Sequence, residues 1–196
     1  MSAITDRAAA RQATALALLE SLRYLDRWGR LGHAELVGSV RHGLVVARDI
    51  DVEVTVPALE PAATFAVAGE LATDPLVARA TYRNQAESRG WLYWEIGAHG
   101  EDGEEWTIET YVSGPDDPYA GWSAELASAL AAALTDEQRA AILALKEALA
   151  DDPDYRAMDV YRAVVDGGVR SPAELAEWRE ASGSSELVRW LPALRR

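Results

Sequence analysis

Asp49 and Asp51 are the two residues of this 196-residue chain whose types and spacing point most directly to chemistry. They lie in a segment, residues 49–56, in which polar and apolar residues alternate strictly. This period is typical of a strand with one buried face, so both carboxylates project from the same side, about 6.6 Å apart along the strand. Two carboxylates in this arrangement can share the divalent cations that prefer oxygen ligands and bind substrate phosphates, Mg²⁺ or Mn²⁺. A solvated strand face is the alternative interpretation.

Gly38 and Ser39 come shortly before this segment, with nine residues between Ser39 and Asp49. A glycine lets a backbone approach a ligand closely, and Ser39 opens a helical turn whose free N–H groups suit a phosphate. Ser39 can equally be an ordinary helix cap, and the two roles are compatible. The sequence therefore predicts a phosphate site next to a metal site.

The combination resembles the nucleotidyltransferase superfamily, which includes DNA polymerase beta and the aminoglycoside nucleotidyltransferases. The elements that carry the resemblance are Val37-Gly38-Ser39 and the acid-apolar-acid-apolar run that begins at Asp49. The resemblance implies that Asp49 and Asp51 hold metal ions and that Gly38 and Ser39 cradle the β- and γ-phosphates of a nucleoside triphosphate. It covers most of residues 31–180, and its tail is similar to the helical part of a small group of nucleotidyltransferase-like proteins.

A third carboxylate from a later strand completes the metal site in this superfamily and often helps to deprotonate the attacking hydroxyl. Glu109 is the best match, because it alternates away from the apolar residues Trp106 and Ile108. Aspartate is more usual at this place, and the extra methylene of glutamate changes the reach of the carboxylate. Glu95 is the reserve candidate.

Further residues are expected to contact phosphates or a base. The resemblance implies that Lys146, the only lysine, holds the triphosphate, although a solvated helix position is the plainer role. Arg41 and Arg48 flank the motif and can contact phosphates or form salt bridges with acids. Trp91 or Trp94 can stack on a base, although core packing is the more general role of tryptophan.

The elements that must position these residues indicate an α+β fold, and the resemblance implies a mixed sheet flanked by helices and followed by an all-helical C-terminal domain. We expect an α+β domain over residues 1–115 and a helical domain over residues 116–196. The predicted strands are 48–56, 77–84, 91–98 and 105–112, with a short one before Gly38. The predicted helices are 4–29, 41–46, 61–73, 120–134, 135–150, 155–166, 171–181 and a short one near 186–191.

Composition excludes several functional classes. The formal net charge is −13, which repels nucleic acid and anionic membranes. The chain has no cysteine, hence no disulfide, thiol nucleophile or iron–sulfur cluster, and a cytoplasmic location is expected. No signal peptide and no membrane span is expected. No Walker loop, Gly-x-Gly-x-x-Gly or Gly-x-Ser-x-Gly motif occurs.

The resemblance implies an enzyme that needs Mg²⁺ or Mn²⁺ and transfers a nucleoside monophosphate from an NTP to a hydroxyl, with release of pyrophosphate. The acidic charge favours a small, cationic acceptor, with a protein acceptor as a further possibility. A non-catalytic relative that senses nucleotides or binds a protein partner is the alternative, favoured by glutamate at position 109. Exposed apolar faces of the C-terminal helices can support a homodimer.

Overall fold

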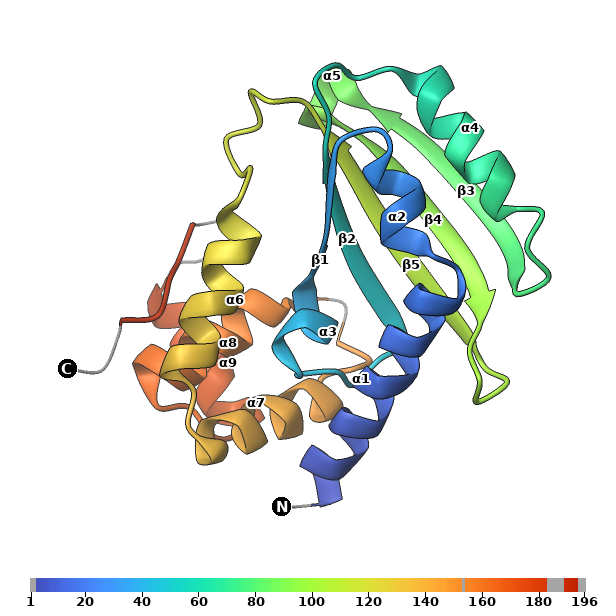
Figure 1. The fold of residues 1–196 in the computed structure, drawn as a ribbon. Coiled ribbons are helices and arrows are strands. Elements are labelled where there is room, and N and C mark those ends of the chain that lie inside the picture. Colours follow the sequence, from blue (N-terminus) through green and yellow to red (C-terminus); the bar gives the residue numbers. More distant parts are fainter. Residues whose placement is uncertain (1–2, 153, 183–188, 194–196) are drawn as a thin grey trace.

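The computed structural model describes residues 3–152, 154–182 and 189–193, and its centre is one five-stranded mixed sheet (Figure 1). The strand order is β1-β2-β5-β4-β3, in which only β2 and β5 run parallel to each other. The strands are β1 (His33–Val37), β2 (Asp49–Thr55), β3 (Val77–Gln85), β4 (Trp91–His99) and β5 (Glu105–Ser113). The sequence patterns predict these strands to within about two residues, since each has an alternating or apolar run bounded by turn residues.

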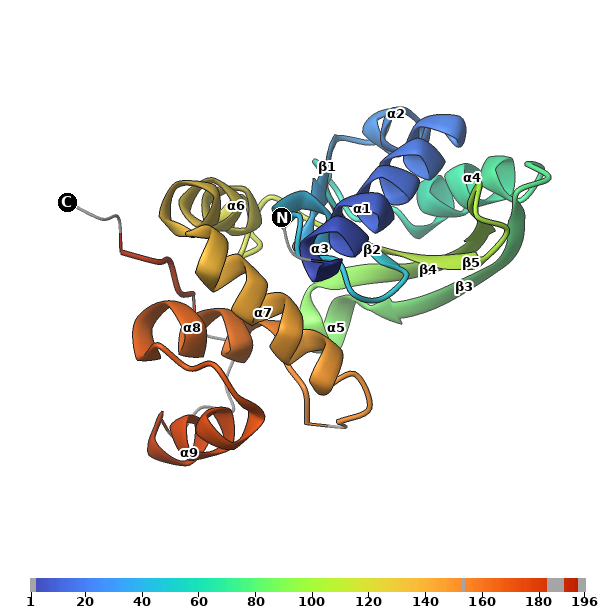
Figure 2. The same ribbon diagram turned by 90° about the horizontal axis from the view of Figure 1, so that it is seen from below.

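Three helices cover one face of the sheet: α1 (Ala3–Ser21), α2 (Tyr24–Gly29) and α4 (Pro61–Leu71) (Figure 2). The apolar residues of β2, which include Ile50, Val52 and Val54, are fully buried beneath them. Because neighbouring residues of a strand point to opposite faces, the acidic residues of β2 lie on the other side. Because the helices pack on the apolar face of β2, its carboxylates must project from the other face.

The single helix predicted over residues 4–29 is two helices in the structure. Arg23 adopts the left-handed conformation, with φ 45°, and separates α1 from α2. The bend lets Tyr24 and Trp28 be fully buried, and the Tyr24 hydroxyl lies 2.7 Å from Thr110 Oγ1 on β5. Apolar spacing alone does not show this break, because both helices keep leucine and aromatic residues at helical intervals.

A short helix, α3 (Gly38–His42), follows β1 directly. The sequence predicts a helical turn at 41–46, three residues too late. Gly43 in the left-handed conformation ends α3, and Leu44 and Val45 are buried in the irregular segment that follows. The apolar run after Gly43 therefore belongs to the core and not to a helix.

The second half of the chain is helical, as expected. Thr135 and Gln138 form a reciprocal capping box at the start of the second of these helices. The helices are α6 (Trp122–Ala133), α7 (Asp136–Ala148), α8 (Ala157–Gly167) and α9 (Pro172–Ser182), while α5 (Ala86–Arg89) is a single turn between β3 and β4. Of the helix expected near 186–191, residues 189–191 are not helical and 186–188 lie outside the described residues.

Two groups of buried apolar side chains stabilise the molecule, one between the sheet and its helices and one among α6 to α9. The second group also includes Ala8 of α1 and Leu44, which follows α3. The sheet half therefore contributes directly to the helical core. Within the described residues, none of the helices combines the length and the apolar character that crossing a bilayer requires.

Candidate functional site

The carboxylates singled out in the sequence meet on the face of the sheet that α1, α2 and α4 leave open. Strands β2 and β5 are parallel neighbours in the middle of the sheet (Figure 1). Their register places Asp51 beside Glu109 and Asp49 beside Thr107. Asp49, Asp51 and Glu109 are all partly buried. Their neighbours along the same strands, such as Ile50 and Ile108, are fully buried on the opposite face. The sheet therefore brings the three acids into one row.

A cavity of about 310 Å³ lies over this face, between the sheet and the helical half. Asp49 and Asp51 line it together with Gly38 and Ser39, so two parts of the motif that are ten residues apart face the same space. The helical half contributes the opposite wall. The remaining lining residues are Val37, His42, Glu53, Tyr111, Trp122, Ser123, Leu126, Ala157, Met158 and Tyr161.

Gly38 is required at its position for two physical reasons. Its φ is +63°, in the left-handed region where a side chain is strained. A Cβ at this position would also collide with the carboxylate of Asp51. The backbone of the β1–α3 junction therefore passes directly beside Asp51, and only glycine permits this approach.

The only lysine of the chain, Lys146, forms a hydrogen bond with Ser39. Lys146, on α7, is 3% exposed, and its Nζ donates hydrogen bonds of 2.7 Å to Ser39 Oγ and to the carbonyl oxygen of Leu44. Burial lowers the pKa of Lys146 to about 8, although Asp49 and Asp51 act in the opposite direction. Lys146 is not among the residues that line the cavity. The structure therefore places the lysine against Ser39, beneath the surface of the cavity.

The electrostatics of the row show that its carboxylates repel one another. Burial, reinforced by the charges of Asp49 and Glu109, raises the pKa of Asp51 to about 7. The charge of Lys146 lowers it in part. A cation placed among these groups would relieve both the burial of charge and the repulsion.

Glu109 has a tyrosine partner. The Tyr111 hydroxyl donates a 2.7 Å hydrogen bond to Glu109 Oε2, and Glu109 itself is not among the residues that line the cavity. Glu95, the reserve candidate, forms an ion pair with Arg79. Of the two candidates, Glu109 is therefore the one beside Asp51 and free of an arginine partner within the described part of the chain.

The two flanking arginines lie outside the cavity lining. Arg41 is exposed on α3. Arg48 lies 3.5 Å from Asp102 and 4.0 Å from Glu104, both of which belong to the turn that connects β4 and β5. Their expected contact with phosphates stays a prediction.

The structure adds residues that no motif in the sequence singles out. His42 lines the cavity with its ring 5.8 Å from that of Tyr161, and both of its ring nitrogens are buried without a partner in the described structure. Burial, reinforced by the charge of Lys146, lowers the pKa of His42 to about 4, so its ring is neutral. Ser123 Oγ of α6 donates a 2.5 Å hydrogen bond to Glu53. A lone histidine or serine has no recognisable spacing, so only the fold reveals these contacts.

The shape of the chain matches solved structures. A crystal structure of the Cid1 poly(U) polymerase aligns with a TM-score of 0.59 and 12% identity over 83% of this chain and 53% of that one. A second Cid1 structure, described for its RNA terminal uridylyl transferase activity, gives 0.57 and 13% over 79% and 46%. The GLD-2/RNP-8 complex gives 0.51 and 11% over 94% and 74%. These proteins are nucleotidyltransferase-superfamily members. The chain has the nucleotidyltransferase fold.

The likeness is one of fold and not of sequence. No protein-family model matches the chain, and no curated protein is similar to it in sequence. The chain spans about half the length of the two Cid1 structures. What the nucleotidyltransferase fold contributes is the pairing of β2 with β5, which sets Asp51 beside Glu109.

The donor chemistry of the site fits a divalent cation. Asp49 and Asp51 both face the cavity, and hard carboxylate oxygens are the ligands that Mg²⁺ prefers. Among the described residues, no three His, Asp or Glu side chains are grouped closely enough to hold a metal by themselves. Mg²⁺ commonly takes one or two carboxylates and completes its shell with water and substrate phosphates. The two aspartates therefore fit the protein contribution that such a cation needs.

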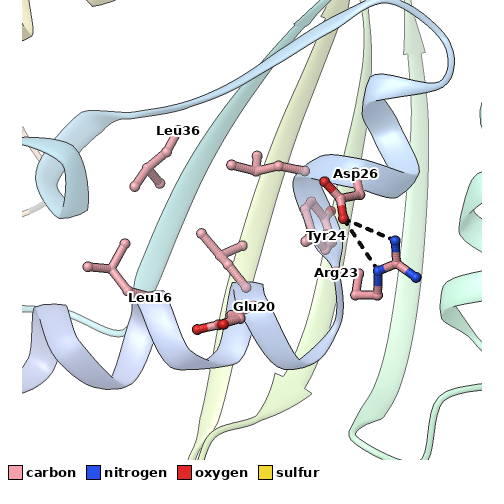
Figure 3. Close-up of a pocket in the computed structure, with 8 residues that line it drawn as sticks. Leu16, Glu20, Arg23, Tyr24, Asp26 and Leu36 are labelled. Carbon is pink, nitrogen blue, oxygen red and sulfur yellow. Dashed lines mark hydrogen bonds and ion pairs between the residues drawn. The ribbon is translucent and has the colours of Figure 1, made fainter.

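A second cavity, of about 550 Å³, lies on the helix-covered side of the sheet (Figure 3). Leu16 of α1 faces Leu36 of β1 across it, and the ion pair between Arg23 and Asp26 stands at its edge. Leu36 points to the opposite face from its neighbour Val37, which lines the carboxylate cavity. The two cavities are thus on opposite sides of β1.

Proposed function

We propose that the chain is a nucleotidyltransferase that transfers a nucleoside monophosphate from an NTP to a hydroxyl group and requires Mg²⁺ or Mn²⁺. The observation that carries the proposal is the cavity in which Asp49 and Asp51 face the same space as Gly38 and Ser39. Acidic side chains beside a close backbone approach suit a cation that is bound together with phosphates. The nucleotidyltransferase fold supports the same assignment.

Each group has a role in this reaction. Asp49 and Asp51 would hold the metal, which when bound would neutralise phosphate charge and orient the triphosphate. The backbone at Gly38 and the hydroxyl of Ser39 would receive the β- and γ-phosphates, with Lys146 fixing Ser39 from behind. Glu109, held by Tyr111, would accept the proton of the acceptor hydroxyl, directly or through a water.

The reaction balances with these groups alone. The acceptor oxygen forms a bond to the α-phosphorus of the NTP, and the bond from that phosphorus to the bridging oxygen breaks. Pyrophosphate takes the electron pair of the broken bond, and the hydroxyl proton passes to the carboxylate and then to solvent. The protein contributes position and electrostatics, which dominate phosphoryl-group transfer.

The acceptor is not determined by the carboxylate site. The formal charge of −13 favours a small or cationic acceptor over a long nucleic acid. Cid1 is described as a poly(U) polymerase with RNA terminal uridylyl transferase activity, so a nucleic-acid acceptor is a candidate for this fold as well.

The partner of Glu109 favours a second candidate function. Glu109 accepts the Tyr111 hydrogen bond and does not line the cavity, so the third carboxylate is engaged beside the site. A protein that binds a nucleotide through Asp49, Asp51 and Ser39 without transferring it would fit this arrangement. Such a protein would act as a nucleotide sensor or bind a protein partner.

Thermal shift with ATP, GTP, CTP and UTP, each with and without Mg²⁺, tests the nucleotide site. Wild type should gain stability with a preferred NTP only when Mg²⁺ is present, and a ligand at about 100 times its dissociation constant adds about 2.7 kcal/mol. The double variant Asp49→Asn/Asp51→Asn should lose this shift, whereas Asp26→Asn, beside the second cavity on the other side of the sheet, should keep it. The absence of a shift with every NTP would refute the proposal.

Pyrophosphate release separates the two functions once a nucleotide is bound. A transferase should release pyrophosphate when acceptors are supplied, and Glu109→Gln should reduce the rate by about 10² or more while the NTP-induced shift persists. A nucleotide shift without pyrophosphate release from any acceptor would favour the sensor.

A further inference from the structure

An aromatic row extends from the carboxylates across the open face of the sheet. We define the aromatic row as Trp91, Tyr93 and Tyr111. The ring of Tyr111 on β5 lies 5.3 Å from that of Tyr93 and 6.0 Å from that of Trp91, both on β4. The Tyr111 hydroxyl reaches Glu109, so the row begins at the candidate general base.

Two arginines lie over the aromatic row. The guanidinium of Arg83, on β3, is 5.4 Å from the ring centre of Tyr93, and that of Arg89, on α5, is 5.9 Å from the ring centre of Trp91. Both arginines are exposed, and within the described residues neither has an ion-pair partner within 4 Å. Arg79, by contrast, is neutralised by Glu95 and Glu105.

The main core of the sheet lies on its other face. Figure 2 shows that α1, α2 and α4 cover the opposite face of β3, β4 and β5. Trp94 of β4 lies there: it is 3% exposed and packs against Trp28 and Phe65. Of the two tryptophans considered for base stacking, only Trp91 is on the face of the carboxylates, and it is partly exposed.

The reaction geometry places the acceptor on this side. This step rests on the proposed function, in which the triphosphate occupies the cavity beside Gly38 and Ser39 at the β1 side of the row of acids. The acceptor hydroxyl must reach the same α-phosphorus from the opposite direction to the leaving pyrophosphate. Across β5 from Asp51, that direction passes Glu109, whose partner on β4 is Glu95. The aromatic row begins two residues further along both strands, where Tyr93 pairs with Tyr111.

We propose that the aromatic row, with Arg83 and Arg89, binds the acceptor, and that the acceptor is a nucleotide. Trp91 and Tyr111 are partly exposed, whereas Tyr93 is only 7% exposed and supports Tyr111 from the side. Accessible aromatic rings stack on bases without strong sequence preference, and arginine planes add stacking and contact phosphate. A cationic acceptor such as an amino sugar would meet two unneutralised arginines. The nucleotide is either free or the 3′ end of a short single strand, because the net charge of −13 disfavours a long one.

Fluorescence anisotropy of a labelled six-nucleotide RNA, without NTP and at low ionic strength, tests this surface directly. Trp91→Leu should weaken binding about tenfold, since it keeps an apolar side chain but removes the stacking ring. Arg83→Gln/Arg89→Gln should weaken binding and reduce the salt dependence by about two ionic contacts. Arg23→Gln, which removes an equally exposed arginine beside the second cavity, should bind like wild type.

Competition distinguishes the two sources of the nucleotide. Displacement of the RNA by a nucleoside monophosphate at similar concentration would identify a free nucleotide as acceptor, and much weaker displacement would identify a strand end. Unchanged binding in the Trp91 and arginine variants would overturn the proposal, as would failure of both RNA and monophosphate to bind. Displacement only by a tyrosine- or serine-containing peptide would overturn the nucleotide assignment.

The thermal shift with Mg²⁺ and NTP, repeated on the same variants, separates this proposal from the proposed function. Trp91→Leu and Arg83→Gln/Arg89→Gln should keep the NTP-induced shift. RNA binding that depends on the row without any NTP shift would support the surface and refute the transferase. An NTP shift with pyrophosphate release, together with unchanged RNA binding in the Trp91 and arginine variants, would support the transferase and refute the acceptor surface.

Discussion

At the scale of single residues, the site is defined by how closely the backbone passes a carboxylate. Gly38 and Asp51 belong to the two parts of the predicted motif and are 13 residues apart, a short separation that predicts proximity. What the spacing does not reveal is that a Cβ at Gly38 would meet Asp51 directly. The glycine is therefore needed by the fold itself as well as by any phosphate.

Gly38→Ala should destabilise the protein and weaken NTP binding. The left-handed conformation costs a non-glycine residue roughly 1–3 kcal/mol, and the collision with Asp51 adds to it. The melting temperature should fall by about 2–4 °C for each kcal/mol in a chain of this size. Gly69→Ala is the matched control, because Gly69 is exposed in α4 with open space around it, and alanine there should be neutral or stabilising. Equal stability of Gly38→Ala and wild type would contradict the geometry.

At the scale of elements, strands were easier to predict than the connections between them. The alternation in residues 49–56 predicts β2 and the side its acids occupy, since period two has one structural meaning. Neither strand sequence predicts that β2 pairs with β5, yet this pairing places Asp51 beside Glu109. The break at Arg23 and the start of α3 at Gly38 were missed, because both depend on left-handed residues selected by packing.

The sequence predicts the geometry of the candidate site only in part, because local spacing is readable from the sequence and long-range packing is not. Asp49, Asp51, Gly38 and Ser39 share one cavity, as a motif of short-range spacing can indicate. The place of Lys146 beneath Ser39 depends on how α7 packs, and no local pattern encodes it. Long-range contacts of this kind are decided by the whole core.

The packing of α7 against α3 makes stability depend on pH through Lys146. The pKa of this lysine is about 8 in the folded protein and near 10.5 in the unfolded chain. Between these values the unfolded state binds more protons, so stability rises with pH. The free energy of unfolding of wild type, minus that of Lys146→Met, should therefore increase by about 2 kcal/mol from pH 7 to 9.5.

Urea unfolding of both proteins across this pH range measures the difference, and titrating groups that do not interact with Lys146 cancel between them. Asp51, whose pKa the charge of Lys146 lowers, adds to the increase in the same direction. Arg139→Met on the same helix is a useful control, because its guanidinium donates to the carbonyl of His42 but does not titrate in this range. A difference that stays constant with pH would show that Lys146 is not buried as a cation beside Ser39.

At the scale of the whole molecule, the two halves share structure at more than the cavity. Ala8 of the first helix and Leu44 are buried with the side chains of α6 to α9. Arg7 pairs with Glu147 at 2.8 Å, and Ser123 donates a hydrogen bond to Glu53 on β2. The cavity wall opposite the carboxylates comes from the helical half, so the site needs both halves in place.

This sharing predicts that residues 1–115 and 116–196, although distinct in composition, unfold together. Separation would expose Lys146, Leu44 and Ala8 at once, and each half would lose part of its buried surface. Calorimetry should show one transition whose calorimetric and van't Hoff enthalpies agree. Leu44→Ala should lower the free energy of unfolding by roughly 2–5 kcal/mol and move this transition to a lower temperature without splitting it. Ala129→Ser, on the outer side of α6 away from this contact, should leave it nearly unchanged. Two separate transitions, only one of which moves in Leu44→Ala, would instead mean that the halves fold independently and that the cavity between them opens without unfolding either one.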